Sequence, residues 1–469
     1  MEVKKLLQGL GYNNLLSDKW YKEIAGWEAW YRGKTAFHRY WIYNGKDKNY
    51  IKRQSLGMAK KLCEDKADLL LNEKVNIYVS PVKESKENAY QDFLDEVLED
   101  NSFWVNGNQL IELANALGTG AFVEYMDGDQ IRIDFVNANY IYPLSWKNRT
   151  ITECAFISNY VSGKNEKPLI YIQVHALNKQ GLYVIQNKLF DAEGKPQPLP
   201  DDVPEELTTG RDKPLYQVFM PNIVNNIDPL NPMGISIYAN CIDDLMFTDT
   251  IYDSYKNEFD LGKKRIFVND SVVKPDPETG DIIPVFDPHD TVFYGLPLGD
   301  GTDQGKKAIV ESNMALRVQD HKTALQDALD VLSDKTGFGK GYYKFDADGV
   351  KTATEIISQN SKLYRKIKKD EIILDKTLTD LAKAILFLGG YQGELVINVA
   401  FDDSIVEDTQ AIANRANLEY TSDLIDKVEY FIRVYNMTEE AAIAHVKNME
   451  SRKGDAPPPP DDEEEGEGA

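Results

Sequence analysis

Residues 233–262 set the strongest limit on how this chain can fold. Apolar residues recur there at spacings of three and four, which is the repeat of one helix face. These apolar positions are Ile235, Tyr238, Ile242 and Leu245. The spacing predicts one helix that begins behind Pro232 and ends at Gly262. Because about 28 helical residues would span about 40 Å, which is long for a globular domain, the stretch predicts a strut.

A second long helix is predicted to return along the chain. Residues 312–335 repeat the helical spacing, whereas residues 263–311 are rich in Pro, Gly and Asp and hold short strand-like runs. The predicted outline is a strut, a small β-rich module and a second strut. The first strut is expected to carry an acidic face formed by Asp243, Asp244, Asp249 and Asp253.

The remaining C-terminal part divides by composition. A glycine-rich loop occupies residues 336–351, and residues 352–403 predict a third long helix followed by a strand. Residues 404–453 are predicted to be helical. Residues 454–469 carry seven acids and no base, a composition typical of a disordered tail.

The N-terminal part, residues 1–232, predicts an α+β domain. Residues 55–74 have the pattern of an amphipathic helix, and the strand pattern on either side of Asp127 and Gly128 indicates a hairpin. The fold class predicted for the chain is therefore α+β.

The charge balance limits the possible partners. The chain holds 76 acidic and 53 basic residues and a formal charge of -23, so a broad surface that grips phosphates is not expected. No run of eighteen apolar residues occurs, and the N-terminus lacks the pattern of a signal peptide. These features predict a chain that stays in the cytoplasm and has no membrane partner.

Several motifs suggest chemistry and then fail on a required residue. Residues 344–355 resemble a calcium loop, but Lys344 occupies the first ligand position, where a cation opposes binding. Lys307 stands where a phosphate loop needs Ser or Thr, and the segment around Ser236 lacks the second glycine of a nucleophile elbow. No cofactor is predicted.

One compact set of possible metal ligands leaves an alternative function open. Asp287, His289 and Asp290 lie within four residues, which is close enough to hold a metal ion, although Asp beside Pro and His is also ordinary turn chemistry. The alternative is a metal-dependent cytoplasmic enzyme.

A narrow group of bases stands out from the acidic chain. Residues 360–369 hold five bases and no acid, and these are Lys362, Arg365, Lys366, Lys368 and Lys369. Such a run on a helix is commonly a solvated face. The functional interpretation of this basic band is light contact with phosphates, and the loop before it adds Lys340 and Lys344.

The segments NPMGISIYANCIDDLMFTDTIYDSYKNEFDLGKKRIFV and MALRVQDHKTALQDALDVLSDKTGFGKGYYKFDADGVKTATEIISQNSKLYRKI resemble the portal proteins of tailed bacteriophages, in the form found in phages of Gram-positive hosts. The earlier WYRGKTAFHRYWIYNGK and LGMAKKLCEDKADLLLNEKV are similar to the same family, so the resemblance covers about residues 20–452. It implies a ring of identical subunits, typically twelve, at one vertex of the capsid. It also implies that double-stranded DNA is packaged and ejected through the channel of this ring.

The resemblance also implies a division of the chain and a set of partners. Residues 1–232 would form a wing, the two struts 233–262 and 312–335 a stem, and 263–311 a clip. Residues 336–351 would form a channel loop, 352–403 a long wing helix and strand, and 404–453 a crown. The implied partners are the terminase large subunit, head-completion or adaptor proteins, and capsid and scaffolding proteins. The implied location is the virion, after assembly in the host cytoplasm.

By the same resemblance, Lys340, Lys344 and Lys351 would lie near the DNA in the channel loop. The acidic balance fits such a channel, because a wall that bound many phosphates would hold the DNA still. The resemblance implies a structural channel protein with no chemistry of its own, and the absence of a phosphate loop argues against an ATP-driven motor.

Overall fold

The computed structural model describes residues 2–43, 48–81, 87–161, 167–262, 265–269, 293–296, 309–312, 315–344, 353–391, 395–401, 409–422, 424–435, 442–443 and 446–447. The chain divides into two compact units. The first comprises residues 1–351 and 365–401, and the second comprises residues 352–364 and 402–469.

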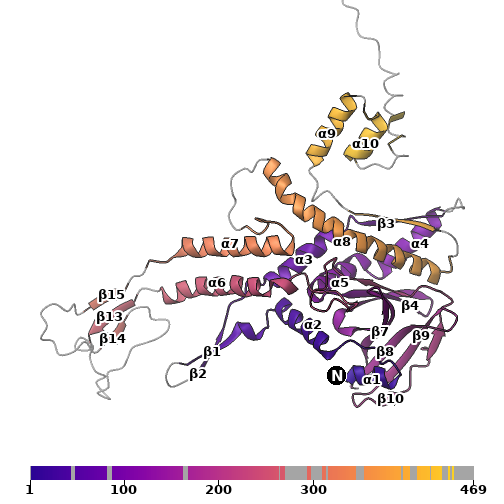
Figure 1. Ribbon diagram of the computed structural model, residues 1–469, viewed down its shortest axis with the longest axis horizontal. Coiled ribbons are helices and arrows are strands. Elements are labelled where there is room, and N and C mark those ends of the chain that lie inside the picture. Colours follow the sequence, from indigo (N-terminus) through magenta and orange to yellow (C-terminus); the bar gives the residue numbers. More distant parts are fainter. Residues whose placement is uncertain are drawn as a thin grey trace, which may run out of the picture. The chain divides into compact units, whose positions relative to one another are not determined.

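Helices of the N-terminal part pack against sheets in the first unit (Figure 1). The helices are α1 (Glu2–Gly9), α2 (Asp18–Tyr31), α3 (Met58–Leu70), α4 (Glu87–Asp100) and α5 (Phe103–Leu117). The helix predicted over 55–74 is confirmed as α3, which buries its apolar residues Met58, Leu62 and Leu70. It begins behind Gly57, which has a positive φ of 74°.

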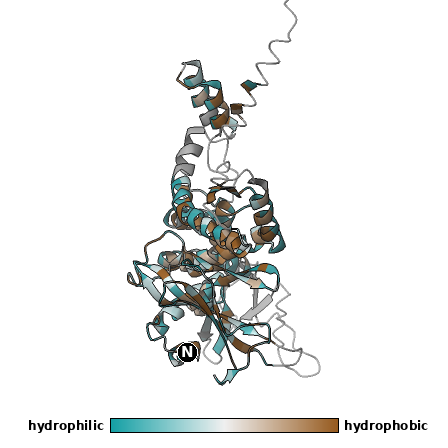
Figure 2. Cartoon of the chain, turned by 90° about the vertical axis from the view of Figure 1, so that its right-hand side faces the viewer, coloured by the Kyte–Doolittle hydropathy of each residue, from teal (hydrophilic) through white to brown (hydrophobic). Residues whose placement is uncertain are grey.

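The largest sheet is antiparallel and has the order β10-β9-β8-β7-β6, with β11 also paired to β9. Its strands are β6 (Ile141–Lys147), β7 (Thr150–Tyr160), β8 (Leu169–Leu177), β9 (Tyr183–Phe190), β10 (Pro196–Gln197) and β11 (Glu206–Thr208). Leu7 of α1 is buried against residues of this sheet, among them Ile172 and Phe190. Seen from the side, the strands carry both hydrophobic and hydrophilic residues (Figure 2).

Two smaller sheets complete this part of the unit. The hairpin predicted at Asp127 and Gly128 is confirmed, because β4 (Gly120–Asp127) pairs with β5 (Gln130–Asn137), and β12 (Tyr216–Phe219) extends the sheet beside β4. Strand β3 (Asn76–Pro81) pairs antiparallel with β16 (Leu395–Ala400), which joins distant parts of the sequence.

The first predicted strut begins later than the sequence suggested. A 3-10 turn, η3 (Ala239–Cys241), precedes α6 (Ile242–Leu261), so residues 233–238 are not helical. They are buried against the end of α5, where Ile237 N–H donates to Asn115 O at 3.0 Å and Gly234 N–H donates to Thr119 Oγ1 at 3.1 Å. The backbones of Gly118 and Gly234 are so close that a Cβ on either would overlap the other. Tertiary packing therefore overrides the helical spacing here.

The return helix also begins later than predicted. Residue Ser312 belongs to strand β15 (Ile309–Ser312), and α7 runs over Val318–Thr336. Strand β13 (Arg265–Asn269) pairs in parallel with β14 (Phe293–Leu296) and antiparallel with β15, so the region between the helices contains a small sheet as the composition indicated.

The third predicted helix is α8 (Ala353–Leu388), which begins one residue after the start of the predicted segment 352–403. Its residues 353–364 belong to the second unit, together with α9 (Thr409–Thr421) and α10 (Lys427–Tyr435). Within that unit Arg433 Nη1 lies 2.7 Å from Glu419 Oε2 and joins α10 to α9. The tail predicted over 454–469 lies outside the described residues.

Among the described residues, none of the helices is both long and apolar enough to cross a lipid bilayer. The predicted α+β mixture of helices and strands is confirmed.

Candidate functional site

Helices α6 and α7 lie side by side in opposite directions (Figure 1). Lys335 near the end of α7 places its Nζ 2.6 Å from Asp244 Oδ2 near the start of α6. At the other end of the pair, Arg317 just before α7 contacts Glu258 near the end of α6. We refer to the part of the pair from Asp244 to Asp253 of α6 as its base and to the part around Glu258 and Arg317 as its distal end.

The distal end is held by a partly exposed ion pair, with 67% of the Arg317 side chain but only 12% of the Glu258 side chain exposed. Arg317 Nη2 lies 2.7 Å from Glu258 Oε2, and Arg317 backbone N–H donates to Oε1 at 3.1 Å. The Arg317 hydrogen bonds lower the pKa of Glu258 to about 2. Gly262, which follows α6, leaves no room for a Cβ, because Leu316 and the Glu258 carbonyl oxygen occupy that space. The two chain segments therefore approach closely where they enter and leave residues 263–314.

The base is held by buried polar groups. Asp249 of α6 lies 2.7 Å from His38 Nε2, with only 5% and 2% of the two side chains exposed. Asp249 also accepts hydrogen bonds from Ser55 Oγ at 3.0 Å and from Leu56 N–H at 2.7 Å. Asp253, one turn further along, accepts from Gln54 N–H at 2.8 Å. These contacts fix α6 to the segment that leads into α3.

The acidic face predicted for the first strut is therefore wrong for two of its four residues. Asp249 and Asp253 are buried and serve as acceptors for the N-terminal part of the chain, and Asp244 is paired with Lys335. Asp243 remains exposed. The sequence interpretation missed this because the partners lie about two hundred residues away.

The described part of the predicted channel loop, residues 337–344, is packed at both ends. Gly337 has a φ of 97° and donates its N–H to Ser333 O at 3.0 Å, which ends α7. Tyr343 Oη donates to Asp65 Oδ2 of α3 at 2.8 Å, and Gln326 Nε2 of α7 donates to Tyr343 O at 2.8 Å. Burial and the hydrogen bond to Asp65 raise the pKa of Tyr343 well above its ordinary value, so it stays a neutral donor.

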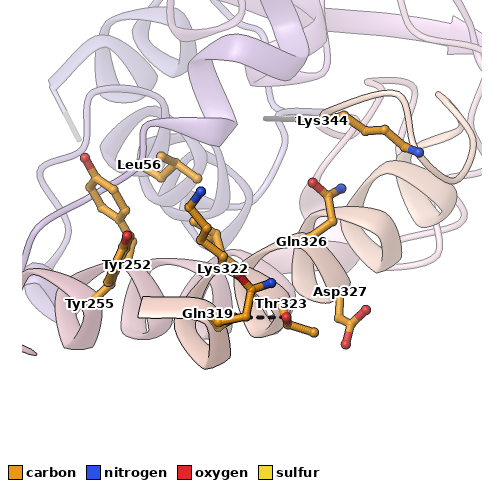
Figure 3. A pocket seen from close by; sticks show the side chains of 10 residues that line it. Leu56, Tyr252, Tyr255, Gln319, Lys322, Thr323, Gln326, Asp327 and Lys344 are labelled. Atoms are coloured by element: carbon orange, nitrogen blue, oxygen red, sulfur yellow. Dashed lines mark hydrogen bonds between the residues drawn. The ribbon is translucent and has the colours of Figure 1, made fainter. Parts of the chain in front are cut away.

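Lys340 and Lys344 are both exposed on this loop. Lys344 lies at the rim of a cavity of about 480 Å³ beside the helix pair, and Figure 3 shows it at one end and Tyr252 of α6 at the other. Lys322 and Gln326 extend from α7 on the same side of the helix, whereas Asp327 points away (Figure 3). The other residues that line the cavity are Leu56, Tyr255, Gln319, Thr323 and Leu325.

The basic band lies on α8. Four of its five bases, Arg365, Lys366, Lys368 and Lys369, belong to the first unit, and Lys362 belongs to the part of α8 in the second unit. Lys368 is paired with Glu371 at 3.0 Å, whereas the side chains of Lys366 and Lys369 are exposed and make no ion pair within the described part of the chain.

The structure brings the band and the predicted channel loop together. A Cβ on Gly337 would lie only 3.0 Å from Lys366 Cγ and 3.2 Å from its Cδ, so the lysine stem covers the start of the loop. Beneath the band, Lys66 of α3 and Asp370 of α8 form an ion pair of 2.6 Å with 5% and 3% of their side chains exposed. Asp370 also accepts from Asn222 N–H at 2.7 Å. These buried contacts position the band.

The remaining candidates lie outside the described residues. These are Lys351, the residues 345–350 of the calcium-like loop, and the possible metal ligands Asp287, His289 and Asp290. Within the ranges that the structure describes, no three side chains of His, Cys, Asp or Glu gather in a way that could hold a metal ion.

A model of the phage portal protein family, SPP1 Gp6-like, matches residues 17–454, and the chain belongs to this family. It is a portal protein, which forms the channel at one capsid vertex through which double-stranded DNA is packaged and ejected. The α+β portal fold and the portal function expected from the sequence are confirmed by this match. The metal-enzyme alternative finds no support in it.

Solved structures of similar chains come from gene transfer agent particles. A chain in the virion of a native particle has 9% sequence identity and a TM-score of 0.48, covering 91% of this chain and 96% of that one. A neck chain of an empty particle, computed with C6 symmetry, has 10% identity and a TM-score of 0.43, covering 80% and 89%. A neck chain of a native particle, computed with C12 symmetry, has 9% identity and a TM-score of 0.42, covering 88% and 93%. No curated protein matches the chain.

Proposed function

We propose that this portal protein assembles as a closed ring of twelve identical subunits and that α6 and α7 form its stem. The family match over residues 17–454 is the observation that carries the proposal. The buried base of the helix pair supports it, because His38 and Asp249 fix α6 to the N-terminal part of the chain as a rigid projection requires. In this assignment residues 1–232 form the wing, 263–311 the clip, 336–351 the channel loop and 404–453 the crown.

The channel surface in this proposal is formed by the loop lysines and the basic band. Lys340 and Lys344 are exposed, Lys351 follows in the same predicted loop, and Lys366 packs on the start of the loop. Each phosphate that a base neutralises adds affinity through the release of counterions. A few bases in a chain with a charge of -23 therefore touch DNA without holding it in place.

The partners follow from the same role. The terminase large subunit supplies the energy of packaging and docks on the portal, head-completion or adaptor proteins close it, and capsid and scaffolding proteins surround it. The subunits assemble in the host cytoplasm and remain in the virion at the capsid vertex. The chain itself catalyses no reaction in this proposal, and no partner is a membrane.

Substitution of the loop lysines tests the channel surface. We expect Lys340→Glu/Lys344→Glu to lower the amount of DNA packaged and retained per capsid, because two bases become like charges to the phosphate backbone. The matched control is Lys179→Glu/Lys213→Glu, which makes the same change in charge at exposed lysines of the wing. Packaging is measured as protected DNA per purified capsid. Equal packaging by both variants would refute the assignment of these lysines.

Ring assembly gives a separate test. Acidic subunits repel one another, so we expect assembly to depend on ionic strength, as measured by light scattering between low and high salt. A ring that forms equally at all salt concentrations would contradict this expectation.

A further inference from the structure

Strands β1 (Arg39–Tyr43) and β2 (Lys48–Lys52) form a sheet of only two strands (Figure 1). Within the described residues this hairpin pairs with no other strand. A two-stranded hairpin that packs on nothing is marginally stable in water. The hairpin therefore needs either a firm root or a second surface to cover it.

The root of the hairpin is firm. Arg53 N–H donates to His38 O at 2.8 Å, and Arg53 Nη1 donates to Phe37 O at 3.0 Å. The Arg53 guanidinium also lies 4.0 Å from the centre of the Phe37 ring. Because His38 is in turn bound to Asp249, the hairpin is anchored to the base of the helix pair.

One face of the hairpin gathers exposed aromatic side chains. In the antiparallel register Trp41 lies opposite Tyr50, and Tyr43 lies opposite Lys48 on the same face. The exposed fractions are 57% for Trp41, 72% for Tyr43 and 48% for Tyr50. The Trp41 and Tyr50 rings pack edge to face with centroids 4.9 Å apart, and Lys48 Nζ lies 4.9 Å from the Trp41 ring. Tryptophan and tyrosine are the residues most enriched in the energetic centres of protein interfaces.

The charged residues of the hairpin are mostly basic. Arg39 lies directly opposite Lys52, a pairing of like charges that destabilises a hairpin. Neither residue makes an ion pair within the part of the chain that the structure describes. Residues 39–53 hold five bases and one acid, whereas the whole chain has a formal charge of -23. A second copy of this chain therefore offers carboxylates that complement the positive charge of the hairpin.

We propose that the aromatic and basic face of the β1–β2 hairpin is an arm that packs on an acidic surface of a neighbouring subunit in the ring. The inference rests on the proposed ring and adds the surface that holds it together. A head-to-tail ring needs each subunit to offer two different surfaces, and the arm is one of them. Covering the aromatic residues and pairing Arg39 and Lys52 with carboxylates removes both weaknesses of the isolated hairpin.

The test uses the purified full chain at a series of protein concentrations, with mass by light scattering and rings counted by electron microscopy. We expect Trp41→Ser/Tyr50→Ser to raise the concentration at which half of the protein is assembled about tenfold or more. Arg39→Glu/Lys52→Glu is expected to act in the same direction through charge. Tyr78→Ser/Tyr140→Ser, which removes two aromatic residues of similar exposure elsewhere, is the control and should assemble as wild type.

Thermal unfolding of each variant, followed by circular dichroism, separates assembly from folding, and we expect the arm variants to unfold like the wild-type monomer. If both arm variants assemble like the wild type, the proposed role of the arm is wrong, and the proposed ring is unaffected. A wild-type chain that forms no ring at any concentration would overturn the proposed ring itself, and the arm with it.

Discussion

The two ends of the α6–α7 pair are stabilised by different means. At the base, Asp249 is buried and accepts hydrogen bonds from groups that precede α3, among them Leu56 N–H. At the distal end, Glu258, whose side chain is 12% exposed, is held by Arg317, whose side chain is 67% exposed and open to water. Ion pairs at the surface contribute little because water and salt screen them, whereas a buried group that loses its partner is costly.

The difference indicates how the helix pair divides its roles. The base joins the helix pair to the N-terminal part of the chain and should open only when the first unit unfolds. The distal end leads into the small sheet of β13, β14 and β15, and it can separate locally at a lower cost in free energy. In the proposed role as a stem, a helix pair that is rigid at its base and adjustable at its distal end would allow the proposed partners to dock at that end.

Removal of the buried acceptor should give the largest effect. Asp249→Ala leaves His38 and Leu56 N–H buried without their partner, so we expect the free energy of unfolding to fall by about 3 to 5 kcal/mol. The measurement is urea unfolding followed by circular dichroism. The control Asp260→Ala removes an acid of the same helix whose partner Lys256 is exposed, and it should cost about 0.5 kcal/mol or less. Equal losses in the two variants would contradict the proposed difference between the ends.

A methyl group at Gly262 should affect the distal end alone. The new Cβ in Gly262→Ala would overlap Leu316 and the Glu258 carbonyl oxygen, and such overpacking costs about 1 to 3 kcal/mol. We expect amide hydrogen exchange in the last turns of α6 to speed up about tenfold or more, while exchange around Asp249 stays unchanged. Gly26→Ala, inside α2 with open space around it, is the control and should be neutral or slightly stabilising. Faster exchange at the base would show that the two ends open together.

The smallest effect concerns the titration of Glu258. Arg317 lowers the pKa of Glu258 from its ordinary value of 4.5 to about 2, so the folded state favours the ionised carboxylate. The resulting stabilisation is present above about pH 4.5 and is lost as the pH falls through about 2. Carboxyl chemical shifts in an NMR titration should report this pKa, and Arg317→Ala should return it toward 4.5. An unchanged pKa in that variant would exclude Arg317 as the cause.

Local patterns in the sequence were sufficient for much of the fold. The Asp127–Gly128 hairpin and the helix through Met58 follow from turn chemistry and apolar spacing, which depend on neighbouring residues. The helix expected from Pro232 begins instead at Ile242, because contacts with α5 hold the preceding residues in another conformation. Local spacing carries no information about such a distant contact.

The sequence could have indicated that acids at the base of the helix pair are buried, but not which residues they bind. Asp249 lies four residues after Leu245 and Asp253 four residues after Asp249, so both lie on the apolar face and not on a solvated one. That register indicates buried acids, but it does not identify His38 as their partner. In the same way, the glycine-rich sequence predicts a loop near Gly337, whereas the packing of Lys366 against it requires the structure.

Electron microscopy of the purified full chain, together with its mass by light scattering, tests the central claim most directly. The account predicts a closed ring with a central hole and a mass of twelve subunits. A chain that stays monomeric across protein and salt concentrations, or an assembly without a central hole, would contradict it.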